Sequence, residues 1–85
     1  MEIMCKKLQK IGQNIGFLPF KGILADKIKA NISQEAWELW MKHQTILINE
    51  YRLNLLDEKS KTFLYAEMEK FFFGENFIDT KQFTA

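Results

Sequence analysis

Residues 42–54 read KHQTILINEYRLN, a stretch in which a glutamine stands among large apolar side chains. The apolar residues recur at the three- and four-residue spacing of an amphipathic helix. We expect this helix to begin at Ser33 and to run to about Leu53, because the Ser33 hydroxyl can accept hydrogen bonds from the free amides of a first turn. It is the longest element that the sequence predicts.

One side of this predicted helix carries its largest side chains. At about 100° per residue, they fall in one arc roughly 120° wide. The members of the arc are Trp37, Trp40, Met41, Leu47, Ile48 and Tyr51. Gln44 lies near the middle, and a buried amide without partners costs about 1–3 kcal/mol. We therefore expect Gln44 to be a core residue that bonds to backbone groups of the N-terminal segment or a loop and fixes how that segment docks.

The N-terminal segment lacks the regular apolar spacing of a helix. Residues 1–20 contain short apolar runs that Gly12, Gly16 and Pro19 interrupt. Such interruptions are typical of a β-hairpin or an extended arm. The first twenty residues are thus predicted to contribute strands to an otherwise helical chain.

Two further helices complete the prediction. One should follow Gly22 and end near Asn31. The other should be capped by Asp57 and end at Gly74, and residues 75–85 lack regular periodicity and are expected to form a mobile tail. The inward-facing residues are predicted to be Leu24 and Ile28 in the first of these helices, and Leu64, Met68, Phe71 and Phe72 in the second.

Composition limits the classes of function. The chain of 85 residues has the length of one domain, and it is 47% hydrophobic and 14% aromatic, which suits a small but dense core. A net charge of +1 provides no global field that would attract nucleic acid or an anionic membrane. No apolar run approaches the roughly 20 residues that cross a bilayer, and the start does not have the pattern of a secretory signal, so a soluble cytoplasmic protein is expected.

Cys5 is the sharpest candidate for chemistry. It is the only cysteine, so an internal disulfide or a CxxC pair is excluded. Lys6 and Lys7 flank the thiol and would favour thiolate, which could act as a nucleophile, an oxidation target or a soft metal ligand. The alternative is that Cys5 is a small buried hydrophobe, which is common for free cysteine.

Metal-binding patterns are sparse. His43 is the only histidine, and none of the residues three and four positions away along the helix is a usual iron or zinc ligand. Glu50 shares its face but lies about 10 Å along the axis. We expect His43 to be a surface residue, and the weak candidate ligands are Cys5, His43 and Glu50.

A second apolar stripe runs along the long helix on the side opposite the tryptophans. Leu39, Ile46 and Leu53 recur every seven residues there. Either the helix is central and packs on two sides, or this stripe is an interface for another protein or a second copy of the chain.

The run from residue 31 to residue 74 resembles the bacterial Fe(2+)-trafficking proteins, which are also described as oxidative-damage protection proteins. The residues that carry the resemblance are Ile32, Ser33, Glu35, Ala36, Trp37, Trp40, Gln44, Thr45, Leu47, Ile48, Asn49, Glu50, Glu67, Met68, Phe71 and Phe73. Cys5 matches the family's N-terminal cysteine. Where the family usually has Pro-Gly-Glu-Leu-Gly and then an arginine two residues later, this chain has Lys21, Ile23, Ala25 and Lys27 as departures.

The resemblance implies a small α+β domain over residues 1–74, with a two-stranded antiparallel hairpin packed on three helices. It also implies a role in passing or guarding Fe(2+) for iron–sulfur cluster synthesis and repair, and in limiting oxidative damage to clusters. The implied iron site is weak or transient, and the implied partners are iron–sulfur cluster proteins or their assembly machinery. No catalytic activity is implied, and we expect a monomer.

Two other classes of function compete with this one. A metal-free interaction module would act through the stripe of Leu39, Ile46 and Leu53. A thiol-dependent enzyme would need a base or a second thiol near Cys5, and the sequence offers neither nearby.

Overall fold

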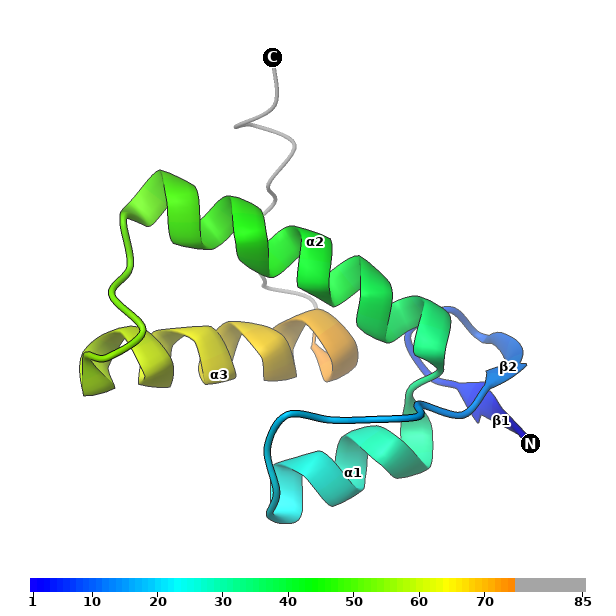
Figure 1. Ribbon diagram of the computed structural model, residues 1–85. Coiled ribbons are helices and arrows are strands. Elements are labelled where there is room, and N and C mark those ends of the chain that lie inside the picture. Colours follow the sequence, from blue (N-terminus) through cyan, green and yellow to red (C-terminus); the bar gives the residue numbers. More distant parts are fainter. Residues whose placement is uncertain (75–85) are drawn as a thin grey trace. The chain divides into compact units, whose positions relative to one another are not determined.

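The computed structural model describes residues 1–74, which fall into two compact units, Met1–Leu39 and the part that begins at Trp40. The elements are β1 (Glu2–Cys5), β2 (Lys10–Gln13), α1 (Ile23–Asn31), α2 (Gln34–Tyr51) and α3 (Glu58–Phe73), as labelled in Figure 1. The predicted α+β class, with an N-terminal two-stranded antiparallel sheet and three helices, is confirmed. The predicted tail at 75–85 lies outside the described residues.

The first unit begins with a short hairpin. Strands β1 and β2 pair so that Ile3 faces Gly12 and Cys5 faces Lys10. The residue that follows each strand is also tied to the end of α1 or to the residue just before α2. The Lys6 N–H donates to the Asn31 carbonyl at 2.8 Å, and Asn14 forms an isolated bridge with Ser33. Figure 1 shows this hairpin beside the end of α1 and the start of α2.

Helix α1 begins without a side-chain cap. Gly22, at the N-cap, has φ 122°, a backbone conformation that favours glycine. The buried face of α1 is made by Ala25 and Ile28, whereas Leu24, predicted to face inward, is only half-buried. The helix ends where the Ile32 N–H donates to the Ile28 carbonyl at 2.8 Å. Ile32 is then extended and fully buried, and this extended residue leads the chain into the start of α2.

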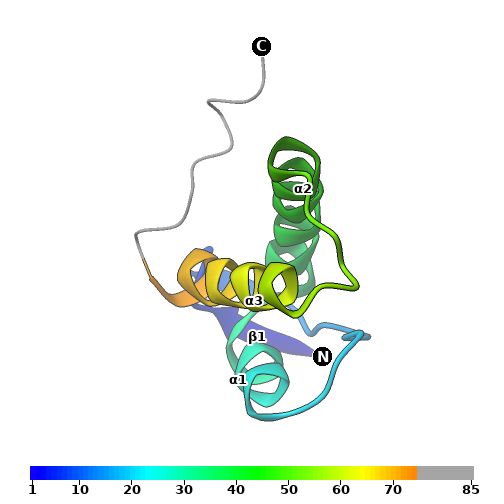
Figure 2. The same ribbon diagram turned by 90° about the vertical axis from the view of Figure 1, so that its left-hand side faces the viewer.

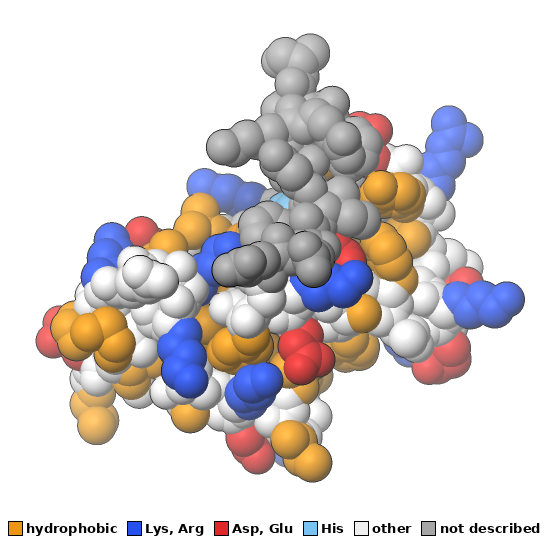
Figure 3. All heavy atoms as spheres, turned by 180° about the vertical axis from the view of Figure 1, so that it is seen from behind, with side chains coloured by type: hydrophobic (Ala, Val, Ile, Leu, Met, Phe, Trp, Pro, Cys, Tyr) orange, Lys and Arg blue, Asp and Glu red, His pale blue; other side chains and the backbone are white. Residues whose placement is uncertain are grey.

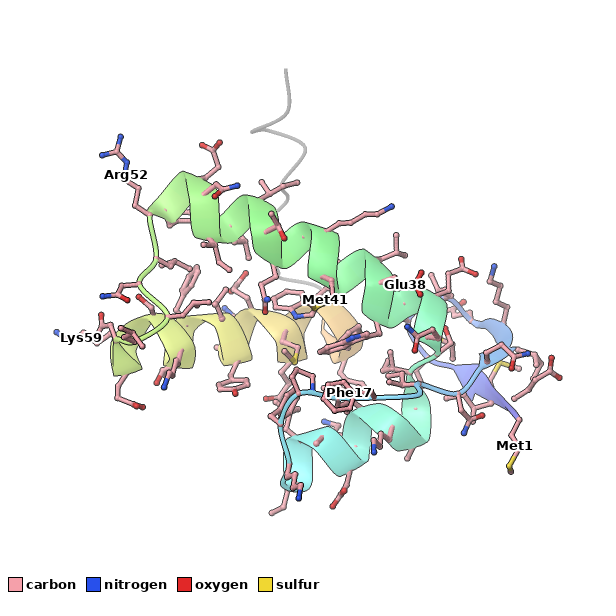
Figure 4. The ribbon with its side chains drawn as sticks, in the orientation of Figure 1. Met1, Phe17, Glu38, Met41, Arg52 and Lys59 are labelled. Atoms are coloured by element: carbon pink, nitrogen blue, oxygen red, sulfur yellow. The ribbon has the colours of Figure 1, made fainter. Side chains whose placement is uncertain are left out.

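Helix α2 begins as predicted. The Ala36 N–H donates to the Ser33 hydroxyl at 3.3 Å, which satisfies one free amide of the first turn. The helix ends at Tyr51, two residues before the predicted end, because Arg52 takes a left-handed conformation with φ 50°. Figure 4 shows the Arg52 side chain pointing away from this end of the helix.

The buried side of α2 is turned from the predicted arc toward His43. Met41 and Tyr51 are 40% and 46% exposed, and Gln44, predicted in the core, is only half-buried. His43 is buried instead. The buried residues of α2 are Ala36, Trp37, Trp40, His43 and Leu47. The apolar residues Met41 and Tyr51 had moved the centre of the predicted arc toward Gln44, although neither is buried.

Helix α3 supplies the other half of the second unit's core. Asp57 caps it by accepting from the Lys59 N–H at 3.3 Å, and the Gly74 N–H closes its last turn on the Lys70 carbonyl at 2.8 Å. Both ends agree with the prediction. Figure 2 shows the 52–57 connection that joins α2 to α3. The buried residues of α3 are Ser60, Leu64, Glu67, Met68, Phe71 and Phe72.

The surface agrees with the near-neutral composition. On the face drawn in Figure 3, basic, acidic and hydrophobic side chains are interspersed. Among the described helices, none combines the length and apolar character that crossing a membrane requires.

Candidate functional site

Cys5 is the last residue of β1, and its side chain is fully buried. A four-residue turn, 6–9, folds over the end of the strand and leads into β2. The turn is closed by a hydrogen bond of 2.7 Å from the Gln9 N–H to the Cys5 carbonyl. Gln9 has φ 55°, which is uncommon for a residue other than glycine. The sulfur is therefore enclosed by a turn that its own backbone helps to close.

Hydrogen-bond donors surround the sulfur. Burial raises the pKa of the Cys5 thiol, but the Ser33 hydroxyl and the backbone amides of Ser33, Leu8 and Lys7 donate to the sulfur and together lower this pKa below its ordinary value. Donors of this kind favour the charged form of an acid. The thiol is thus buried, as one of the two interpretations expected, and these donors shift its ionisation toward thiolate relative to an ordinary cysteine.

Lys7 belongs to the same turn. Its side chain is half-buried, and burial lowers the pKa of its ammonium group, while the nearby Cys5 charge opposes that effect. A cation beside a thiolate stabilises the thiolate. The sequence indicated that lysines follow Cys5, and the structure adds that the backbone amide of Lys7 is one of the groups that lower the pKa of the thiol.

Ser33 is the neighbour that sequence reasoning missed. It lies 28 positions after Cys5, and the sequence pointed to it as the start of a helix and as one of the residues of the family resemblance, but not as a neighbour of Cys5. Its side chain is 1% exposed and is packed against β2 at Gly12. A Cβ added at Gly12 would stand 2.8 Å from the Ser33 Cβ and 3.2 Å from its Oγ. Glycine at position 12 is therefore what allows Ser33 to approach the hairpin this closely.

His43 lies in a different environment, among aromatic rings of the second unit. It is 6% exposed, and its ring centroid is 5.5 Å from that of Trp40 and 4.9 Å from that of Phe71. The prediction of a surface histidine is wrong. The residues three and four positions away along the helix are all apolar. In the sequence analysis this pattern counted against a metal site, but it also indicates that His43 lies on the buried side of the helix.

No cluster of ligands was found for a metal ion in residues 1–74. No group of three or more His, Cys, Asp or Glu side chains in this part of the chain could hold one. Of the weak candidates, Cys5 and His43 are buried in different units, and Glu50 is exposed on α2. Ferrous iron is usually held by several imidazole or carboxylate ligands, so this part of the chain does not itself provide a closed cage for it.

The second stripe of α2 is unevenly exposed. Leu39 is 40% exposed, while Ile46 and Leu53 are half-buried. Central packing of all three residues is therefore not found, and the interface role remains a hypothesis.

Known proteins resemble this chain over most of its length. The family described as bacterial Fe(2+) trafficking matches residues 1–85. A probable Fe(2+)-trafficking protein of Nitrosococcus oceani is 49% identical over 82 residues, which cover 96% of this chain and 91% of that protein. One from Francisella philomiragia is 48% identical over 82 residues, with 96% and 94% covered, and one from Legionella pneumophila is 45% identical over 73 residues, with 86% and 82% covered.

Proposed function

The chain belongs to the bacterial Fe(2+) trafficking family, and on that premise we propose that it passes or guards ferrous iron for iron–sulfur cluster synthesis or repair and protects clusters from oxidative damage. In this proposal Cys5 is the functional thiol and the protein acts as a carrier rather than as an enzyme. The partners are iron–sulfur cluster proteins or the machinery that assembles clusters.

The observation that carries the role of Cys5 is the set of donors around its sulfur. Four hydrogen bonds favour thiolate, which is the form that reacts with oxidants and soft metals. Full burial at the same time keeps bulk solvent away. Chemistry at the sulfur therefore requires the turn at 6–9 to open, and a docking partner could supply that opening.

Weak or shared binding of iron fits the distribution of ligands. Carboxylates and the single imidazole are not gathered into a group of three within the described residues. A shallow site, or one completed by a partner, also releases its metal more readily than a closed cage. Fe(2+) is the cargo in this proposal.

Anaerobic titration of Fe(2+) tests the carrier role. Wild type is expected to bind iron weakly, at micromolar concentrations or above. Cys5→Ser measures the part of the sulfur, and Met4→Ser, an exposed change on the same strand, is the matched control. If neither wild type nor Cys5→Ser binds iron at micromolar concentrations, direct carriage of iron is excluded.

Cluster protection is tested separately. A purified [4Fe–4S] protein is exposed to peroxide with wild type, Cys5→Ser or Met4→Ser, and loss of the cluster is followed by its visible absorbance. We expect wild type and Met4→Ser to slow the loss and Cys5→Ser to slow it less. Equal protection by wild type and Cys5→Ser would remove Cys5 from this role, and no protection by either would remove the role itself.

A metal-free interaction module is the second candidate, because Leu39 leaves 40% of its side chain exposed on α2. In that case Leu39→Glu would abolish function in cells while leaving the fold intact, whereas Cys5→Ser would not. Lys42→Glu, an acidic change at an exposed position of the same helix, is the control. Full function of Leu39→Glu would remove this candidate.

A further inference from the structure

The connection from α2 to α3 is held in one shape by hydrogen bonds. The Asp57 N–H donates to the Asn54 carbonyl at 2.9 Å, which closes a β-turn over residues 54–57. The Asn54 side-chain oxygen accepts the Leu56 N–H at 3.0 Å, and the Asn54 N–H donates to the Ser60 hydroxyl at 3.3 Å. Ser60 is buried in α3. The turn is therefore fixed both from within and by the helix that follows it.

Two leucines occupy the middle of this turn, although Gly, Pro, Asn, Asp and Ser dominate such positions in proteins. Leu55 is 48% exposed and Leu56 is 89% exposed. An apolar side chain stabilises a fold in proportion to the area that it removes from water, so Leu56 contributes little to this one. The fixed backbone nevertheless holds both leucines out to solvent in a single arrangement.

The same connection begins at an exposed aromatic residue. Tyr51, the last residue of α2, is 46% exposed, and its ring centroid lies 5.6 Å from that of the half-buried Phe63 in α3. Tyr51, Leu55 and Leu56 are thus three exposed apolar side chains within one short connection, and we call them the α2–α3 tip. Single exposed apolar residues are normal on a protein surface, whereas a group of them indicates an interaction site.

Cations stand on both sides of the tip. Arg52 follows α2 and Lys59 lies in the first turn of α3, and both are exposed. Figure 4 shows their side chains at this end of the two helices, on either side of the connection. The carboxylates of α3 nearby are engaged: Asp57 accepts the Lys59 N–H at 3.3 Å, and Glu58 pairs with Lys61 at 3.7 Å. Arg52 and Lys59 are therefore the charges that a partner would meet beside the tip.

We propose that the α2–α3 tip is a docking surface for a partner protein, and that the partner segment is an amphipathic helix with carboxylates beside its apolar face. The apolar face of such a helix covers the three side chains of the tip, and its carboxylates pair with Arg52 and Lys59. Because the turn is already fixed, little ordering of this chain opposes binding. This inference goes beyond the proposed function, which places no partner on this connection.

The acidic side chains near the tip favour a protein over a membrane. Glu50, Asp57 and Glu58 are exposed within a few positions of it. An anionic bilayer presents negative charge everywhere and would repel all three. Binding to such a surface also usually takes a wide apolar helix face or a cluster of about 4–8 basic residues. A protein, in contrast, can place its carboxylates opposite the two cations alone.

The direct test uses a synthetic helical peptide with leucines on one face and glutamates on the other. The amide resonances of the ¹⁵N-labelled full chain are followed by NMR as this peptide is added, and a peptide with lysines in place of the glutamates is the control. We expect the glutamate peptide alone to shift the resonances of residues 51–59, and 1 M salt to weaken the effect because it shortens the range of charge interactions to about 3 Å. No shift at about 1 mM glutamate peptide, or equal shifts with both peptides, would contradict the inference.

A matched pair of variants tests the apolar contact. Leu56→Asn places a favoured turn residue in the middle of the turn, so the melting temperature should be kept, but the affinity for the glutamate peptide should fall about tenfold. Ile23→Asn is the control, because Ile23 is also 89% exposed and lies on α1. If Leu56→Asn binds as wild type does, or if Ile23→Asn loses as much, the tip is not the site.

The cations are tested in the same way. Arg52→Gln and Lys59→Gln should each lower the affinity about two- to fivefold, as expected for exposed ion pairs. Lys21→Gln removes one positive charge at another exposed position and should leave the affinity unchanged. Equal losses in all three variants would show that only the total charge matters, and would contradict the inference.

Two further outcomes are decisive. Binding to phosphatidylglycerol vesicles that Leu56→Asn abolishes, without binding to the glutamate peptide, would make the tip a membrane contact and overturn the inference. None of these measurements involves iron. Failure of the iron titration would therefore leave a docking result in place, and failure of docking would leave the proposed iron role in place.

Discussion

Cys5 and His43 are each the only residue of their type in the chain, and both are buried, yet their surroundings differ. Cys5 is faced by backbone amides and a hydroxyl, whereas the ring of His43 packs beside the rings of Trp40 and Phe71. The first environment stabilises a charge, and the second provides apolar contact area. Two equally buried residues therefore differ in the groups that face them, and burial by itself does not describe their environments.

The aromatic environment should dominate the stability of the second unit. Trp40 is fully buried, and within residues 1–74 its Nε1 has no hydrogen-bond partner. Trp40→Ala should lower the free energy of unfolding by about 3–5 kcal/mol, measured by urea denaturation. Trp40→Phe should lose much less, since it keeps a ring and removes the unsatisfied N–H. Equal losses for the two variants would show that ring packing is not what stabilises this unit.

We expect the next largest loss of stability when Cys5 is replaced by a residue that cannot accept hydrogen bonds. Cys5→Val adds a branched side chain to a full site and leaves the amides of Lys7, Leu8 and Ser33 without the sulfur. We expect a loss of about 2 kcal/mol or more in urea denaturation. Cys5→Ser, which can still accept hydrogen bonds, should lose less. A valine variant as stable as wild type would show that Cys5 is only a small hydrophobe.

The contribution of Cys5 to the free energy of unfolding should depend on pH. The hydrogen bonds lower the folded pKa of Cys5 below its ordinary value of 9.0, so in the window between the two the unfolded chain binds more protons than the folded one. Stability due to Cys5 is therefore fully present above pH 9.0 and is lost as pH falls through the folded pKa. The stability difference between wild type and Cys5→Ser, measured under reducing conditions, should rise with pH. A flat difference would contradict a thiolate in the folded state.

The smallest effect is expected at the surface of the first unit. Lys10 and Glu35 form an ion pair at 3.3 Å, and both side chains are more than half exposed. Lys10→Ala should change the free energy of unfolding by less than about 0.5–1 kcal/mol, because exposed pairs are screened by water and salt. A larger loss would show that this pair, rather than the buried contacts, holds the hairpin to α2.

The sequence predicted local features well. The hairpin, the three helices and the caps at Ser33, Asp57 and Gly74 follow from residue types a few positions apart. The phase of α2 was less well predicted, because exposed apolar residues such as Met41 shifted the apparent centre of its buried face. The neighbours of a residue in space are harder still to predict.

The candidate site shows this limit most clearly. Cys5 was identified from the sequence, together with its two flanking lysines. The contact with Ser33 was not, because it depends on how the chain between β2 and α2 returns to the hairpin, and that path leaves no periodic signal. Ile23, where the family usually has a carboxylate, is 89% exposed at the start of α1, and nothing in the structure explains that departure.

The turn at 6–9 has one more consequence. The amides of Lys7 and Leu8 that hold the sulfur are also the amides that would meet solvent when this turn opens. Deuterium uptake at these two positions should therefore depend on whether the sulfur is reduced or oxidised. Hydrogen exchange at these backbone amides would then show whether Cys5 is reduced or oxidised, without a label on the thiol.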